Sequence, residues 1–176
     1  IKKLGRIGPG GDAKGSYLKR TIEYRDCEFV WKGDEKHVHA AAAALGLTDS
    51  KPAESPGTRA TGHAMRDALE ELDDAEASLV ASVGGTIQFI ALDRPDIQYA
   101  AKVVMADASK PTNLTLARLK RLVRYLVGAP VLEWVFKVKT NASQGVPECV
   151  DAESDSDWAD DPKHRKSTTS VFVYFF

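Results

Sequence analysis

The stretch PTNLTLARLKRLVRYLVGAP, residues 111–130, constrains the fold of this chain more than any other. Its apolar residues recur three and four positions apart, so an α-helix would collect them on one side. Gly128 and Pro130 are typical of a helix end. We therefore predict a helix that packs against other helices. Its buried side would consist of Leu116, Leu119, Leu122, Val123, Leu126 and Val127.

The opposite side of this predicted helix is cationic and holds no acidic residue. It carries Arg118, Lys120, Arg121 and Arg124, with Tyr125 among them. Such a side suits a phosphate backbone, because each Lys or Arg releases condensed counterions and a ring can stack on a sugar or base. A cationic face that is simply solvated explains the same pattern. The residues alone leave both interpretations open.

Composition excludes several classes of protein. The chain has 176 residues, of which 43% are apolar and 28% charged, as in globular domains. No apolar run approaches the roughly 18 residues of a membrane span, and the start lacks the apolar stretch of a secretory signal. Two distant cysteines suit neither a disulfide framework nor a zinc site, which favours a reducing, intracellular setting. Because there is no initiator Met, we expect an excerpt of a longer polypeptide.

Charge is distributed unevenly along the chain, although the net charge is only −1. Residues 61–96 hold 8 acidic and 2 basic residues, whereas residues 97–147 hold 2 acidic and 8 basic residues. The middle of the chain is thus strongly basic between acidic segments. This pattern permits nucleic-acid contact from one segment without making the whole chain basic.

The first part of the chain predicts two short strands, at 17–24 and 27–31, joined by a turn at Tyr-Arg-Asp. A helix follows, with Asp34 as its N-cap and Gly46 as its C-cap. Small residues, Pro and Gly dominate residues 48–62, which we interpret as a linker.

After the linker the pattern becomes helical. Acidic residues begin a helix at 66–79, and the pair Gly84-Gly85 either weakens it or allows another backbone to approach closely. Asp93 suits the cap of a further helix, with Pro95 in its first turn. Residues 131–139 alternate as a strand. Trp31 is expected to pack within its hairpin and Trp134 to lie in the core.

Six carboxylates lie between Asp151 and Asp161, and a basic, polar stretch separates them from the apolar run Val171 to Phe176. A calcium loop needs oxygen ligands at alternating positions and a glycine, and Ala159 breaks that pattern with no Gly following. Two interpretations remain. One is a solvated acidic loop. The other is a nuclease carboxylate at a strand end, Asp155, since two-metal phosphodiester hydrolysis needs several carboxylates around its Mg²⁺ ions.

Taken in order, the motifs resemble the reverse transcriptase of copia-type LTR retrotransposons, running into the start of the RNase H domain. The resemblance covers nearly the whole chain. The segments that carry it are LGLTDSKPAESP, LVASVGGTIQFIALDRPDIQYAA, KPTNLTLARLKRLVRYLVGA and SDSDWADDPKHRKSTTSVFV.

The resemblance implies a fragment of an RNA-directed DNA polymerase with RNase H that contributes template–primer binding. Leu18 and Lys19 would lie at a primer grip, and the cationic helix would belong to the thumb. Asp155 would be the first RNase H carboxylate and a Mg²⁺ ligand. Implied partners are an RNA–DNA hybrid or DNA template–primer duplex and the remainder of the Pol polyprotein, with no membrane. The implied location is a cytoplasmic virus-like particle or the nucleus.

The implied fold class is α+β. Residues 1–50 would form a palm-edge hairpin and helix, 51–75 a linker and an acidic helix start, and 76–130 a helical thumb bundle. Residues 131–176 would form a connection and the first strands of an incomplete RNase H-like sheet.

Several positions depart from the family pattern. Lys19 and Ser170 replace glycines, Val80-Ala81 replaces Tyr-Arg, and Glu153 replaces an aromatic. The polymerase motif Tyr-x-Asp-Asp does not occur in the sequence. We therefore expect no catalysis from the fragment alone, and a non-catalytic remnant that serves as a binding or scaffold module stays an alternative.

Overall fold

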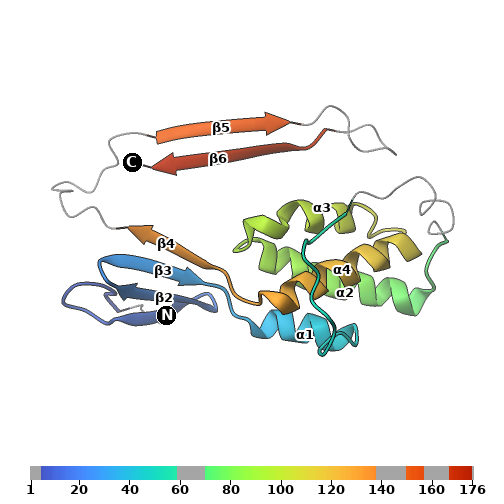
Figure 1. Cartoon of the computed structure of the whole chain (residues 1–176), viewed down its shortest axis with the longest axis horizontal. Coiled ribbons are helices and arrows are strands. Elements are labelled where there is room, and N and C mark those ends of the chain that lie inside the picture. Colours follow the sequence, from blue (N-terminus) through green and yellow to red (C-terminus); the bar gives the residue numbers. More distant parts are fainter. Residues whose placement is uncertain (1–4, 59–69, 138–149, 157–166, 176) are drawn as a thin grey trace. The chain divides into compact units, whose positions relative to one another are not determined.

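The computed structural model describes residues 5–58, 70–137, 150–156 and 167–175 (Figure 1). The chain divides into two compact units, residues 1–138 and residues 139–176, which are described separately. The fold is mixed α+β, as expected, with four α-helices and two sheets among the described residues.

The first unit contains a four-stranded antiparallel sheet in the order β1-β2-β3-β4. Its strands are β1 (Lys14–Tyr17), β2 (Arg20–Arg25), β3 (Glu28–Lys32) and β4 (Glu133–Lys137). The strand predicted from the alternating residues after 131 is confirmed as β4. It returns from a distant part of the chain to pair with β3, from Lys32↔Glu133 to Glu28↔Lys137.

Both hairpin turns differ from the sequence prediction. The expected first strand is interrupted at Leu18 and Lys19, and the second turn is centred on Asp26 and Cys27 rather than on Tyr-Arg-Asp. All four residues have positive φ, between 48° and 63°. Two central residues of positive φ are typical of type I′ hairpins, which match the twist of the strands. Such turns favour Asn-Gly. The sequences Leu18-Lys19 and Asp26-Cys27 therefore do not indicate hairpin turns at these positions.

Four α-helices, with one 3-10 turn between them, make up the rest of the described first unit. They are α1 (Lys36–Ala44), α2 (Asp74–Ala91), η1 (Pro95–Ile97), α3 (Gln98–Ala106) and α4 (Asn113–Gly128). All four α-helices contribute to one apolar core. Its fully buried residues include Val38, Val80, Ile87, Val104, Leu119, Leu122 and Leu126.

The helix ends show how far local signals go. Glu35, not Asp34, occupies the N-cap of α1, although Asp34 Oδ1 still accepts a hydrogen bond from the Lys36 amide at 3.1 Å. Gly46 follows α1 with φ 66°, the left-handed conformation typical of a helix terminus. Asp73 caps α2 by accepting from the Glu76 amide at 2.8 Å. The helix start predicted at 66 is too early, because residues 70–73 precede α2, and residues 66–69 lie outside the described residues.

Trp134 does not lie in the core as predicted. Its side chain belongs to β4, where it is 37% exposed and stacks on Phe136 with the ring centroids 6.2 Å apart. Every residue of β4 is exposed, because this strand forms one edge of the sheet. Trp31, by contrast, packs within the molecule as expected and is only partly exposed.

The described part of the second unit is an antiparallel hairpin of β5 (Val150–Ser156) and β6 (Thr169–Phe175). Residues 157–166, which follow β5 and include the carboxylates Asp157, Asp160 and Asp161, lie outside the described residues.

Candidate nucleic-acid interface

The position and rotation of helix α4 are fixed by its N-terminal cap and by its apolar side. Thr112 caps it through a reciprocal pair of contacts with Thr115, so two backbone N–H groups at the helix start find partners. All but one of the residues predicted for its buried side are buried, and Val127, the exception, packs against the core. The rotation of α4 is therefore fixed, and with it the direction of its cationic side chains.

Arg118 and Lys120 are the first two cations of α4. Arg118 lies 3.8 Å from Asp107 in an ion pair whose two side chains are each 27% exposed. A pair so long and so solvated contributes little free energy and leaves the guanidinium able to exchange partners. Lys120 is exposed.

Arg121 and Arg124 contact a segment that the sequence predicted to be a linker. Residues 47–58, here called the strap, run along α4: the Ala53 amide donates to the Arg124 carbonyl at 3.3 Å. Arg124 Nε donates to the Lys51 carbonyl at 2.7 Å, and Arg121 Nη2 donates to Ser55 Oγ at 2.9 Å. Both acceptors are neutral. The hydrogen bonds therefore fix the two guanidinium groups without cancelling their positive charge.

Gly128 shows how closely the strap approaches the end of α4. A Cβ at this position would lie 2.8 Å from Pro52 Cβ, closer than van der Waals contact allows. The absence of a side chain at Gly128 thus lets the strap lie against the helix terminus. Sequence alone indicated only that Gly128 ends the helix.

Tyr125 is committed to a polar cluster rather than directed freely to solvent. Its hydroxyl donates to Asp96 Oδ2 at 2.9 Å, and the Arg94 guanidinium lies 6.0 Å from its ring centroid. The hydrogen bond to Asp96 raises the pKa of the Tyr125 phenol. Arg94 is only 4% exposed and binds both Asp96 oxygens, at 2.9 and 2.7 Å. Tyr125 is only partly exposed, and its stacking on a base stays a prediction.

Leu18 and Lys19 form the tip of the β1–β2 hairpin. Leu18 is 66% exposed, and Arg20 Nη1 donates to its carbonyl at 3.1 Å, which braces the strained turn from inside. Lys19 also lines a groove of about 700 Å³ whose other cations are Lys14, Lys32 and Lys36. Lys32 and Lys36 are paired with Glu133 and Asp34, at 2.7 and 2.5 Å.

Asp93 is an important residue whose role the sequence did not reveal. Predicted as a helix cap, it instead accepts from Arg20 Nε at 2.8 Å and from Trp31 Nε1 at 3.0 Å. Its carbonyl accepts from Trp134 Nε1 at 2.8 Å. Three strands of the sheet are thereby tied to the end of α2. Arg20, Trp31 and Trp134 are all distant from Asp93 in the sequence. No local pattern therefore indicates that they meet there.

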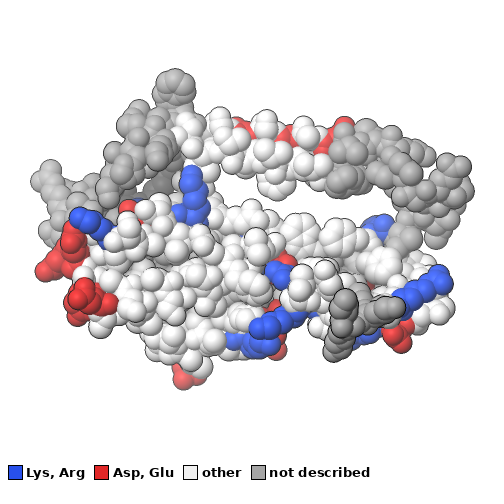
Figure 2. Space-filling model, turned by 180° about the vertical axis from the view of Figure 1, so that it is seen from behind, with Lys and Arg blue, Asp and Glu red and all other residues white. Residues whose placement is uncertain are grey.

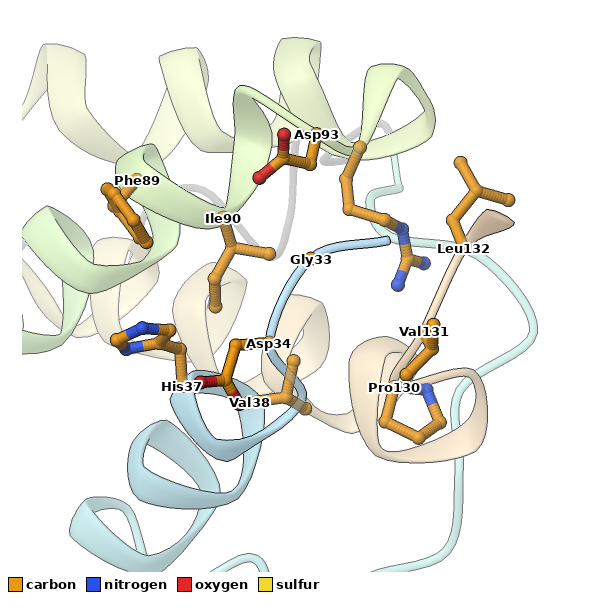
Figure 3. A pocket seen from close by; sticks show the side chains of 11 residues that line it. Gly33, Asp34, His37, Val38, Phe89, Ile90, Asp93, Pro130, Val131 and Leu132 are labelled. Carbon is orange, nitrogen blue, oxygen red and sulfur yellow. The ribbon is translucent and has the colours of Figure 1, made fainter. Parts of the chain in front are cut away.

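A small cavity lies beside this joint (Figure 3). Asp93, Phe89 and Ile90 face it from the end of α2, and His37 and Val38 from α1. Its volume is about 20 Å³, room for about one water molecule and far too little for a nucleotide. The cavity therefore belongs to the packing of the joint and offers no ligand site.

Asp155 lies in β5, one residue before the strand ends at Ser156, and pairs with Ser170 of β6. Asp151, Glu153 and Asp155 share one face of the hairpin, since residues two apart in a strand point the same way. Carboxylates recur along this hairpin in Figure 2. Residues two apart in a strand are about 6.8 Å apart along it. Among the described residues, no group of three His, Cys, Asp or Glu side chains could hold a metal ion.

Lysine and arginine side chains do not form one continuous patch on the face shown in Figure 2. Small cationic groups are separated there by uncharged surface, with acidic side chains among them.

Comparison with known proteins gives a consistent set of relatives. The chain is 30% identical over 132 residues to a "Retrovirus-related Pol polyprotein from transposon RE1" of Arabidopsis thaliana, and 29% identical over 132 residues to its RE2 counterpart. Each alignment covers 75% of this chain and 8% of the relative. An "Uncharacterized mitochondrial protein AtMg00810" of the same plant is 30% identical over 129 residues, 73% of this chain and 50% of the relative.

The chain therefore spans a small fraction of the two Pol polyproteins and half of the mitochondrial protein. No family model matches the chain. No solved structure matches it either. Among the described residues, no helix is both long and apolar enough to cross a bilayer.

Proposed function

Since the chain is homologous to a segment of the Pol polyproteins of copia-type retrotransposons, we propose that it binds the template–primer duplex for a reverse transcriptase. The ligand would be an RNA–DNA hybrid or a DNA duplex, held through its phosphates. In this proposal the helical bundle acts as the thumb, and the sheet of β1 to β4 acts as the palm edge with the primer grip at Leu18 and Lys19.

One observation carries the proposal: Arg121 and Arg124 are fixed in position by neutral oxygens. A guanidinium that is ordered but not neutralised loses little side-chain entropy on binding a phosphate and keeps its full electrostatic attraction for one. Lys120 and the loosely paired Arg118 add cations on the same helix.

Asp155 supports a narrower proposal, because its place near the end of β5 suits the first RNase H carboxylate. The other carboxylates required for a two-metal site would come from parts of Pol outside the described residues. We assign Mg²⁺ and the chemistry of polymerisation and hybrid cleavage to the longer polyprotein, and derive no catalytic step for this chain.

Binding of the 176-residue chain to an RNA–DNA hybrid, measured by fluorescence anisotropy over a range of salt, tests the proposal. Each phosphate contact contributes about 0.9 to the slope of log affinity against log salt. We expect the double variant Arg121→Glu/Arg124→Glu to lower the affinity about tenfold or more. We also expect that slope to fall by the contribution of about two phosphate contacts.

A control should change the net charge elsewhere on the first unit. Arg6→Glu/Lys102→Glu makes the same change before β1 and on α3, at two exposed positions outside the groove that Lys19 lines. If both double variants reduce affinity equally, the chain attracts nucleic acid only through its net charge, and the proposal for α4 is wrong.

The mitochondrial relative favours a second candidate function. The matching region makes up 50% of that protein but only 8% of the RE1 polyprotein. This segment therefore also occurs in a much shorter chain. A stand-alone binding module would bind duplex without a polymerase. Translation of the flanking genomic sequence separates the two: an upstream Tyr-x-Asp-Asp in frame supports the polymerase, and stop codons there support the module.

A further inference from the structure

Arg121 uses only half of one edge of its guanidinium group. Nε–H and Nη2–H lie on the same edge, the one that binds two oxygens of a phosphate or carboxylate side by side. Nη2 donates to Ser55 Oγ at 2.9 Å, whereas Nε is buried and has no hydrogen-bond partner within the part of the chain that the structure describes. A single hydroxyl oxygen thus binds at an edge of the guanidinium group that can bind two oxygens.

Ser55 presents its hydroxyl directly to this edge. Oγ donates to the Gly57 carbonyl at 3.0 Å, which holds the strap in a tight turn, and accepts from Arg121. Arg124 lies one helical turn further along α4 and binds the same strap at Lys51. Two guanidinium groups therefore face the strap, and in the described residues neither takes part in an ion pair.

Ser55 is also singled out by the residue that follows it. Of the eight prolines in the sequence, only Pro56 is preceded by Ser or Thr. Proline-directed protein kinases require this dipeptide. The one dipeptide of this kind in the chain is thus the one whose hydroxyl meets an arginine with an unfilled donor.

We propose that Ser55 is a phosphorylation site and that Arg121, assisted by Arg124, binds the resulting phosphoserine. In the modification, Ser55 Oγ forms a bond to the γ-phosphorus of a nucleoside triphosphate, and the bond from that phosphorus to the β–γ bridging oxygen breaks. The nucleoside diphosphate leaves, and the hydroxyl proton passes to the kinase's general base. Two phosphate oxygens then fill Nε and Nη2 of Arg121.

The consequence for α4 rests on the function proposed above. A phosphoserine carries a charge of about −1.5 to −2 at neutral pH, which balances the two guanidinium charges. It would also fasten the strap to α4 by charge-assisted hydrogen bonds. Phosphorylation would therefore remove two cations from the duplex-binding face and weaken binding of the template–primer.

The first test needs no nucleic acid. The full chain is treated with a proline-directed kinase and ATP, alongside Ser55→Ala, and the phosphorylated chain is titrated by ³¹P NMR. The second pKa of free phosphoserine is about 6. Since adjacent cations favour the dianion, we expect that pKa to be lower in the phosphorylated chain than in its Arg121→Gln variant, by about one unit, a tenfold change in proton affinity.

Two variants keep this test decisive. Arg121→Lys retains the charge but not the two-donor edge, and should recover only part of the difference; it also serves if Arg121→Gln does not fold. Lys120→Gln removes a charge from the same helix away from Ser55 and should leave the titration unchanged. Failure of the kinase to modify Ser55 would overturn the inference. Identical titrations of the parent chain and an equally well folded Arg121→Gln variant would overturn it too.

Hybrid binding then separates the two proposals. A lowered phosphoserine pKa together with reduced affinity for the hybrid supports both. A lowered pKa with unchanged hybrid affinity supports the phosphoserine site and counts against duplex binding by α4. If the unmodified chain binds hybrid through α4 but the titration does not depend on Arg121, duplex binding stands and the phosphoserine site is wrong.

Discussion

Arg20 Nε lies 2.9 and 2.8 Å from the two carboxylate oxygens of Asp93, although the residues are 73 positions apart. Both side chains are largely buried, with 11% and 12% of their surface exposed. The Arg20 guanidinium also lies 4.9 Å from the centre of the Phe89 ring, close enough for a cation–π interaction. Because Arg20 braces the carbonyl of Leu18, this pair connects the tip of the hairpin to α2.

Removing the Asp93 carboxylate should destabilise the first unit strongly. Asp93→Ala leaves the Arg20 charge buried without its partner and deprives Trp31 of its acceptor, so we expect a loss of about 3 kcal/mol in the free energy of unfolding. Urea unfolding followed by circular dichroism measures it. Asp49→Ala, at an exposed loop position, is the control and should stay within about 0.5 kcal/mol of the parent. A loss below about 1 kcal/mol for Asp93→Ala would mean that the joint is not as we describe.

The sequence predicted α4 and β4 because each carries its own periodicity. The buried side of α4 follows from a repeat of about 3.6 residues, and the alternation after residue 131 follows from a repeat of two. Neither prediction needs knowledge of the partner element. The same reasoning identified the four cations of α4 as one side of a helix, and the structure places them on the side away from the core.

The contacts that define the candidate site could not be predicted in this way. The strap contains Pro52 and Pro56 among small polar residues, which is also the composition of a flexible linker. Its attachment to α4 depends on single hydrogen bonds between residues 66 and 73 positions apart. Likewise, the turn at Leu18 and Lys19 is imposed by the sheet and by Arg20, against the local preference of both residues.

Acid should weaken the cluster around Asp96 in a defined pH range. Burial acts to raise the pKa of the Asp96 carboxyl, but hydrogen bonds from Arg94 and Tyr125 outweigh it and hold the pKa below the usual value. An unfolded Asp titrates near about 3.9. The stabilisation by this carboxylate is therefore complete above about pH 4 and is lost as the pH falls through the lowered pKa of the folded state.

The variant Asp96→Asn isolates this contribution. It should be less stable than the parent at about pH 7, and the difference between the two should shrink as the pH falls below about 4. Thermal unfolding at a series of pH values measures it, with Asp49→Asn as the reference. A difference that stays constant down to the lowest pH at which both chains fold would contradict the role of Asp96.

Lys19 should strengthen binding of the hybrid but lower the free energy of unfolding. Its φ of 63° costs a residue with a side chain about 1 kcal/mol relative to glycine. We expect Lys19→Gly to raise the free energy of unfolding by about that amount while weakening hybrid binding through the loss of one cation. Lys14→Gly, in the adjacent strand, removes the same charge from the same groove but should destabilise the sheet. An unchanged hybrid affinity in Lys19→Gly would argue against a primer-grip role.

The neighbouring glycines of α2 should respond to alanine in opposite directions. A Cβ at Gly84 would overlap Met105 Sδ of α3, whereas a Cβ at Gly85 would meet nothing within 4 Å. Gly85→Ala should therefore stabilise the chain by about 1 kcal/mol through helix propensity alone. Gly84→Ala gains the same propensity but must displace the Met105 side chain, so we expect a net loss of about 1 kcal/mol.

A double-mutant cycle identifies the cause of that loss. Met105→Ala removes the atom in conflict, so Gly84→Ala should become neutral or stabilising in the Met105→Ala background. Gly85→Ala should have the same effect in both backgrounds, because a Cβ there would not reach Met105. Equal effects of Gly84→Ala with and without Met105 would show that α2 and α3 do not approach each other at this glycine.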